Sequence, residues 1–150
     1  VTVGKGLGGG FPVAALLLTE AMAATVKPGE HGTTFGGGPM ACAAVEATLD
    51  ILEQEALLDR ATHLFEDTRS AMAISGVSEV RGGGVWIGLR LDRPAKPVQR
   101  ALLHQGFLVG TATDPCVLRL APPAITPEYA VFELASALRQ VLERRVSDAA

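Results

Sequence analysis

One lysine near the start of the chain has the surroundings that amine chemistry requires. Lys5 lies between Gly4 and Gly6, and Gly4 directly follows the β-branched run 1–3. That run predicts the end of a β-strand, and the two glycines leave the ε-amine open to approach. Desolvation or a nearby cation activates such an amine to attack a carbonyl and form a Schiff base. The alternative is a solvated lysine on a flexible loop, and the tripeptide alone favours that plainer interpretation.

The glycines around Lys5 also resemble two nucleotide-binding patterns. Residues 4–9 fit G-x-G-x-x-G, but a dinucleotide fold needs a helix to begin there, and a Gly-Phe-Pro sequence with an apolar, strand-like run follows instead. The Walker pattern fails because Gly6 stands where Ser or Thr must follow the lysine. A dinucleotide-binding domain is therefore the weakest alternative, and a helix beginning at Gly9 would revive it.

The first third of the chain must position this lysine. Residues 11–19 form an apolar run that predicts a buried strand, and residues 20–24 predict a helical turn. Residues 26–38 have the composition of a loop. A helix is then expected from Pro39 to about Glu53, with Gly38 as its N-cap.

The remainder of the chain predicts a small α+β layer. A second helix fits residues 56–73, and from about residue 75 the pattern reads β-β-α-β-β-α. The predicted elements are strands 77–81 and 85–91 joined by a glycine hairpin, a helix at 97–105, strands 107–109 and 117–120, and a helix that begins at Thr126-Pro127. Trp86 lies on an apolar strand, so we expect it in the core and not as a stacking platform.

Composition excludes several classes of protein. The 150 residues are 48% hydrophobic and carry a net charge of −3, which permits a buried core and argues against binding nucleic acid or an anionic membrane. No stretch approaches the roughly 20 apolar residues of a membrane span. Cys42 and Cys116 form neither a disulfide framework nor a metal motif. We therefore expect both to be small buried side chains, in a protein of the reducing cytoplasm. Because the sequence starts with residues typical of the end of a strand, we expect it to be the C-terminal part of a longer protein.

Four segments in order carry a resemblance to a known family. They are GKGLGGGFPVAALLL, HGTTFGGGPMACAAVEATLDIL, EVRGGGVWIGLRL and VLRLAPPAIT, and a final helix follows them. Together they resemble the class III aminotransferases, pyridoxal-phosphate enzymes of fold type I, and acetylornithine aminotransferases look nearest among them. The resemblance covers nearly all 150 residues and is more specific than any one motif.

The resemblance implies a role for each of four residues. Lys5 matches the family lysine that bonds to pyridoxal phosphate and then moves the proton. Thr34 matches the threonine that reaches the cofactor phosphate of the neighbouring subunit, which implies a homodimer. Thr33 matches a position that contacts substrate, and Arg119 matches the arginine of an RxxPP segment near the substrate carboxylate. Without the resemblance, Thr33 and Thr34 would be a simple turn and Arg119 a surface ion-pair residue. No metal is implied.

The same resemblance implies a fold and shows which functional groups of the family this sequence lacks. The fold is α/β, with residues 1–50 as the end of the large cofactor-binding domain and residues 51–150 as the small C-terminal α+β domain. The groups that bind the pyridine nitrogen, stack on the ring and hold the α-carboxylate precede the lysine in the family and do not occur in this sequence. Gly38 replaces the usual asparagine, which would soften the loop that carries Thr34.

The implied activity is an exchange of amino groups between N-acetylornithine, or a related ω-amino compound, and 2-oxoglutarate in arginine biosynthesis. The isolated chain is expected to be inactive because it lacks those earlier groups. The competing interpretation is a non-catalytic binding or assembly module derived from the small domain.

Overall fold

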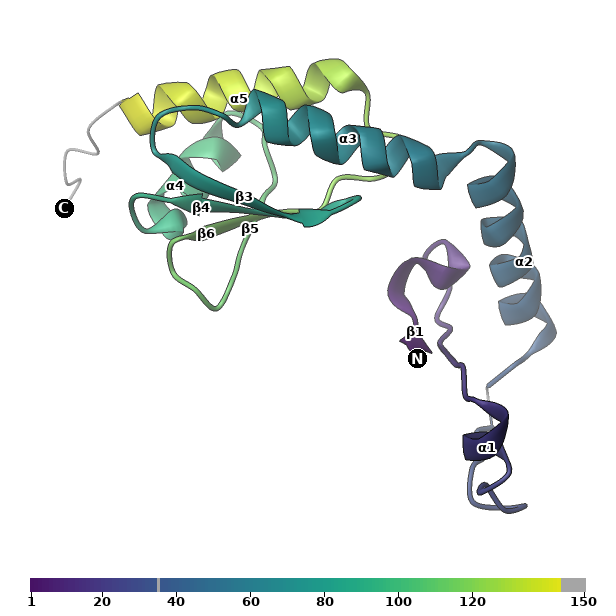
Figure 1. Ribbon diagram of the computed structural model, residues 1–150. Coiled ribbons are helices and arrows are strands. Elements are labelled where there is room, and N and C mark those ends of the chain that lie inside the picture. The colour runs from purple at the N-terminus through teal and green to yellow at the C-terminus, as the bar shows by residue number, and fades with distance from the viewer. Residues whose placement is uncertain (35, 144–150) are drawn as a thin grey trace. The chain divides into compact units, whose positions relative to one another are not determined.

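The chain folds into two compact units, residues 1–56 and residues 57–150, in a computed structural model that describes residues 1–34 and 36–143 (Figure 1). Each unit is described by itself. The division falls between Ala56 and Leu57, a few residues beyond the boundary that the sequence predicts. None of the described helices is long and apolar enough to cross a membrane.

The first unit contains little sheet. Strands β1 (Thr2–Val3) and β2 (Ala15–Leu16) pair antiparallel and flank the 3₁₀ helix η1 (Lys5–Gly8). The prediction of a buried strand over residues 11–19 is wrong for this chain. Only two of these residues pair, and Leu16 is 58% exposed, because a two-residue partner strand cannot cover the apolar run.

Two helices complete the first unit, and both begin where the sequence predicts. Helix α1 (Glu20–Ala23) starts after Thr19, whose hydroxyl accepts a hydrogen bond from the Met22 amide at 3.3 Å. Helix α2 (Pro39–Gln54) starts with proline at its first position and Gly38 as N-cap. The prediction of a buried Cys42 is wrong, because this side chain is exposed on α2, with its Sγ 3.5 Å from the Gly37 carbonyl oxygen.

The second unit has the predicted β-β-α-β-β-α order after its first helix. In chain order its elements are α3 (Leu57–Ala71), β3 (Val77–Gly83), β4 (Trp86–Leu91), α4 (Ala95–His104), β5 (Gly110–Thr111), β6 (Val117–Leu120) and α5 (Glu128–Glu143). The four strands form one antiparallel sheet in the order β3-β4-β6-β5. The prediction of a strand at 107–109 is wrong. These residues precede the sheet, and β5 begins to pair at Gly110, which lies opposite Arg119.

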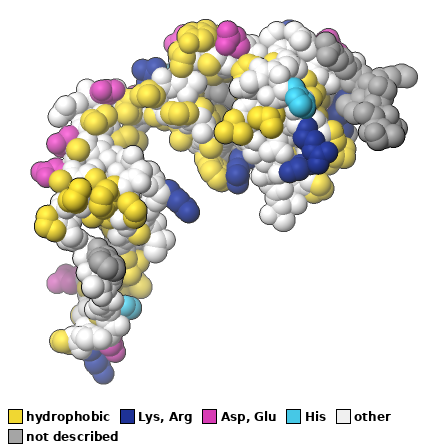
Figure 2. Space-filling view, turned by 180° about the vertical axis from the view of Figure 1, so that it is seen from behind, with side chains coloured by type: hydrophobic (Ala, Val, Ile, Leu, Met, Phe, Trp, Pro, Cys, Tyr) yellow, Lys and Arg dark blue, Asp and Glu magenta, His cyan; other side chains and the backbone are white. Residues whose placement is uncertain are grey.

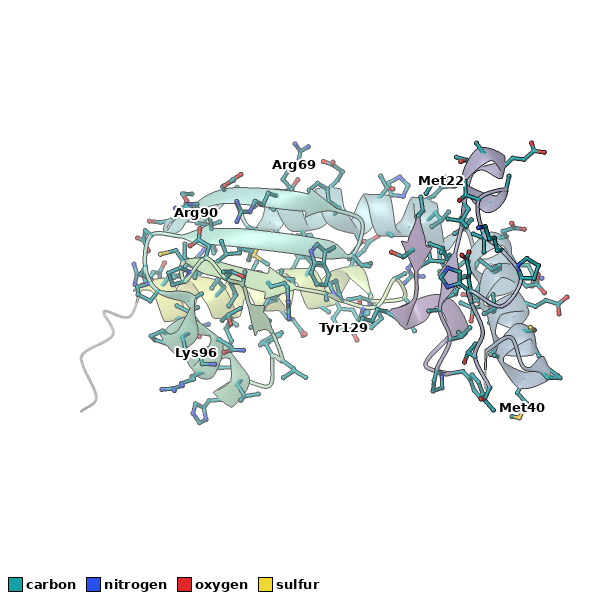
Figure 3. The ribbon with its side chains drawn as sticks, turned by 90° about the horizontal axis from the view of Figure 1, so that it is seen from below. Met22, Met40, Arg69, Arg90, Lys96 and Tyr129 are labelled. Carbon is teal, nitrogen blue, oxygen red and sulfur yellow. The ribbon has the colours of Figure 1, made fainter. Side chains whose placement is uncertain are left out.

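The core of the second unit lies between the sheet and its helices. Alternate strand residues such as Ile87, Leu89 and Leu118 are fully buried and pack with Val98 and Leu102 of α4 and Leu138 of α5. The opposite face of the sheet carries Trp86, Arg90 and Arg119, which are exposed. Figure 3 looks onto this face, with α3 and α5 behind the strands.

The prediction that Trp86 belongs to the core is therefore wrong. Its side chain is 61% exposed, while the next residue along the strand, Ile87, is fully buried. Successive side chains of a strand point to opposite faces, so the burial of Ile87 places Trp86 on the outer face.

Candidate functional site

Lys5 occupies a constrained turn with its side chain exposed. It opens η1 and has a φ of +58°, a left-handed conformation that non-glycine residues adopt rarely. The Leu7 amide donates to the Gly4 carbonyl at 3.3 Å, and the Gly9 amide donates to the Gly6 carbonyl at 3.0 Å. The backbone on both sides of the lysine is thus tied into the turn, and the amine projects from a defined point. Such backbone strain is typical of functional positions.

The turn that follows η1 argues against nucleotide binding. Gly9 ends η1 in a left-handed conformation, and the next helix in the chain is α1, which begins only at Glu20. A dinucleotide site needs a helix N-terminus directly after the glycines, so that its amides meet the pyrophosphate. The helix at Gly9 that would have revived this alternative does not form.

Thr33 and Thr34 lie in the predicted loop before α2, and both are exposed. The backbone passes close beneath Thr33: a Cβ added at Gly36 would overlap the Cγ2 of Thr33. A larger residue at Gly36 would therefore require the Thr33 side chain to move. A glycine-rich loop with an exposed hydroxyl is a suitable place for an anion.

Arg119 occupies the centre of the outer face of the sheet in the second unit. It pairs in register with Gly88 of β4 and Gly110 of β5, so neither neighbouring strand places a side chain directly opposite it. The guanidinium carbon lies 5.1 Å from the centroid of the Trp86 ring. A hollow of about 430 Å³ opens at this point and is lined by Arg119, Trp86 and Arg81, among others.

Arg90, on the same face of the sheet, is paired with a carboxylate. Arg90 donates to Asp114 at 2.6 Å, and the other oxygen of Asp114 accepts from the Cys116 amide at 2.9 Å. The Cys116 amide and the Arg90 guanidinium hold the pKa of Asp114 below its ordinary value. Within residues 1–34 and 36–143, no carboxylate lies within 4.0 Å of Arg119, so the ion-pair alternative for this arginine is not observed.

The predicted residues therefore fall into two groups. Lys5, Thr33 and Thr34 belong to the first unit, where no hydrogen bond among the described residues joins the lysine to either threonine. Arg119 belongs to the second unit and is grouped there with Trp86, which sequence reasoning missed. The alternation of Trp86 with Ile87, Leu89 and Leu91 was the available signal, because it assigns the tryptophan to the face opposite the core.

Comparisons with known proteins cover most of the chain. Residues 1–142 match the family described as aminotransferase class-III. Acetylornithine aminotransferase 1 of Bordetella parapertussis is 43% identical over 130 residues, which are 83% of this chain and 33% of that protein. The chain spans about a third of the length of the curated relatives it matches.

Solved structures show the same relationship. The acetylornithine aminotransferase of Elizabethkingia anophelis matches with a TM-score of 0.82 and 32% identity, over 95% of this chain and 38% of that one. The ornithine aminotransferase of Toxoplasma gondii matches with a TM-score of 0.83 and 28% identity, over 95% of this chain and 36% of that one. The resemblance of the four motifs is confirmed, and with it the expectation of a fold type I enzyme dependent on pyridoxal phosphate. The chain belongs to the class III aminotransferases.

Proposed function

We propose that the full-length protein containing this chain moves an amino group from N-acetylornithine, or a related ω-amino compound, to 2-oxoglutarate, and so serves arginine biosynthesis in the cytoplasm. The observation that carries the proposal is the exposed Lys5 on its left-handed turn, inside a segment shared with class III aminotransferases. Relatives named acetylornithine aminotransferase, at 39–43% identity, support the choice of donor.

The residues of the first unit fit the cofactor. Lys5 supplies an accessible primary amine for the cofactor aldehyde, and Thr34 supplies a hydroxyl for the phosphate of the cofactor in the neighbouring subunit. Main-chain amides of the glycine-rich loop 36–38 are further donors that such a phosphate could use. When bound, pyridoxal phosphate supplies a carbonyl that condenses with amines and a conjugated ring that accepts an electron pair.

Each residue then has one task in the reaction. Lys5 holds the cofactor, and its Nζ then takes the proton from the amine-bearing carbon of the donor. Arg119 binds a substrate carboxylate through two parallel N–H bonds, the geometry that a guanidinium offers and an ammonium does not. Thr33 contacts the donor. We assign Thr34 to the phosphate in the neighbouring subunit, so the active enzyme is a homodimer.

The two units correspond in this proposal to the end of the large domain and to the small domain. The chain alone has no turnover, because the groups that activate the cofactor ring lie elsewhere in the family.

Figure 2 shows hydrophobic side chains on the surface of each unit. In the first unit, Leu16, Leu17 and Met22 are each more than half exposed, so the isolated chain self-associates, as light scattering would show.

A donor panel tests the proposal. The full-length protein is assayed with 2-oxoglutarate and either N-acetylornithine or ornithine, and kcat/KM is compared. N-acetylornithine is expected to give the higher value, and the Lys5→Ala variant is expected to lose turnover by several orders of magnitude. Lys27→Ala is the matched control and retains activity. A preference for ornithine would replace N-acetylornithine as the favoured donor, turnover with neither compound would overturn the assignment to an ω-amino donor, and a normal rate in Lys5→Ala would overturn the mechanism.

A further inference from the structure

Trp86 is an exposed aromatic side chain with a charged partner. It is 61% exposed on the outer face of β4, and the alternation of buried and exposed residues along this strand does not require an apolar residue there. The guanidinium of Arg119 lies over its ring, with 5.1 Å between the guanidinium carbon and the ring centroid. This separation is within the range of a cation–π interaction, and tryptophan is the strongest aromatic partner for a cation.

Gly110 confines the same guanidinium from another direction. A Cβ added at Gly110 would lie 3.0 Å from Nε of Arg119 and 3.1 Å from its Nη2. These distances are tighter than ordinary contacts, so the arginine occupies the space that a side chain on β5 would take. Gly110 is directly opposite Arg119 in the sheet register, which explains why the two residues meet.

The hollow beside Arg119 is positively charged. Arg81 of β3 also lines it. Gly88 of β4 lies between the two arginines, because Arg81 pairs with it from β3 and Arg119 pairs with it from β6. A Cβ at Gly88 would lie 3.4 Å from Cγ of Arg81, so this side chain also leans over the glycine. The nearest carboxylate partner of Arg81 is Glu79 at 4.0 Å, a distance that leaves most of its charge available.

We propose that Trp86 is a positioning residue for Arg119: the indole face and the bare backbone at Gly110 hold the guanidinium toward the hollow before a carboxylate arrives. An exposed arginine otherwise loses considerable rotamer freedom when it binds, and that loss weakens affinity. A guanidinium already held by a ring loses less. The inference rests on the proposed function in one respect, namely that Arg119 receives a substrate carboxylate.

The experiment measures Arg119 directly in the full-length protein, because the isolated chain is expected to self-associate. Nuclear magnetic resonance (NMR) follows the Nε–H signals of the arginines, and the Arg119→Lys variant identifies the signal that belongs to Arg119. The probe is glutarate, a dicarboxylate with no amino or keto group. We expect the Arg119 signal to be shifted upfield by the indole ring and to move further as glutarate is added.

Substitutions at Trp86 and Gly110, with a control at Tyr129, separate positioning from packing. Trp86→Leu removes the ring, abolishes the upfield shift and weakens glutarate binding about two- to fivefold, the effect of losing an exposed cation–π contact. Trp86→Phe restores a ring and recovers most of the affinity. Gly110→Ala keeps the tryptophan, pushes the guanidinium aside and also weakens binding. Tyr129→Leu, a change at another exposed aromatic residue that does not line this hollow, leaves affinity unchanged.

Equal glutarate affinity in the wild-type chain, Trp86→Leu and Trp86→Phe would overturn the proposal. A wild-type Arg119 signal without an upfield shift, or one that glutarate does not move, would overturn it as well. Neither result touches the donor panel or the role of Lys5, so failure of this inference is distinguishable from failure of the proposed function.

Discussion

Gly8 offers a sharp test of how the lysine turn is packed. It is the buried residue of η1, and a Cβ added there would lie 2.6 Å from Cγ1 of Val13. Real Cβ atoms essentially never come closer than 3.0 Å to another heavy atom, so Val13 or the turn must move by about 0.4 Å. Val13 is β-branched and stiff, which limits the relief that its own rotation provides. The Gly8→Ala substitution is therefore expected to strain the segment that carries Lys5.

The size of the effect follows from a matched control. Gly6 lies in the same turn, and a Cβ there would meet nothing within 4 Å. Both substitutions reduce the freedom of the unfolded chain by the same amount, worth about 0.4–1 kcal/mol. Only Gly8→Ala adds overpacking, which costs about 1–3 kcal/mol. The difference between the two variants is thus about 1–3 kcal/mol of local stability.

Hydrogen exchange at the Phe11 amide measures that difference. This amide donates to the Gly8 carbonyl at 2.9 Å, so its protection reports on the turn. Exchange in Gly8→Ala should exceed that in Gly6→Ala by about 5- to 150-fold, since 1.36 kcal/mol corresponds to a factor of ten. Equal exchange in the two variants would refute the packing argument, as would slower exchange in Gly8→Ala.

Three further predictions concern the cofactor, the core and a charged pair. Thr34→Ala in the full-length enzyme should weaken cofactor binding by about 1–3 kcal/mol, the usual cost of losing a hydrogen bond to a charged group; equilibrium dialysis against pyridoxal phosphate would show it, and unchanged affinity would contradict the role. Leu118→Ala should destabilise the second unit by about 2–5 kcal/mol, because Leu118 is fully buried in the core; urea unfolding followed by Trp86 fluorescence measures the loss, and a cost below 1 kcal/mol would contradict the packing. Asp114 has a folded-state pKa below its ordinary value, so it stabilises the fold above the unfolded pKa of about 4 and ceases to do so as the pH falls through the folded pKa. The difference in stability between the wild type and Asp114→Asn should therefore be present at pH 6 and vanish in strong acid, and a difference that grows on acidification would contradict this sign.

Much of the fold could be predicted because its signals are local. The start of α2 follows from Pro39 after Gly38, and β6 follows from the run 117–120. The strand predicted at 107–109 failed because pairing with β6 depends on register, which a short apolar run does not specify. The run 11–18 failed for a different reason: apolar character predicts burial, but burial also requires a covering surface, which this chain does not supply at Leu16 and Leu17.

The site was predictable only in part. The flanking glycines make Lys5 a candidate, and only the family resemblance gives it a role; its left-handed φ and its place in a 3₁₀ turn have no simple sequence signature. Arg119 was identified from its motif alone. The apolar character of strand 85–91 predicts its partner Trp86 in the core, whereas the alternation along the same strand places it on the outer face. Gly110 became visible only through the register that places it opposite Arg119.

The central claim is that Lys5 is the lysine that bonds to pyridoxal phosphate. The chain has two other lysines, Lys27 and Lys96, which serve as internal controls. Borohydride reduction of the full-length protein with its cofactor, followed by digestion and mass spectrometry, locates the modified lysine. We predict the cofactor mass on the peptide containing Lys5 and on neither control, with loss of the label in Lys5→Ala. Label on Lys27 or Lys96, or undiminished label in Lys5→Ala, would contradict the claim.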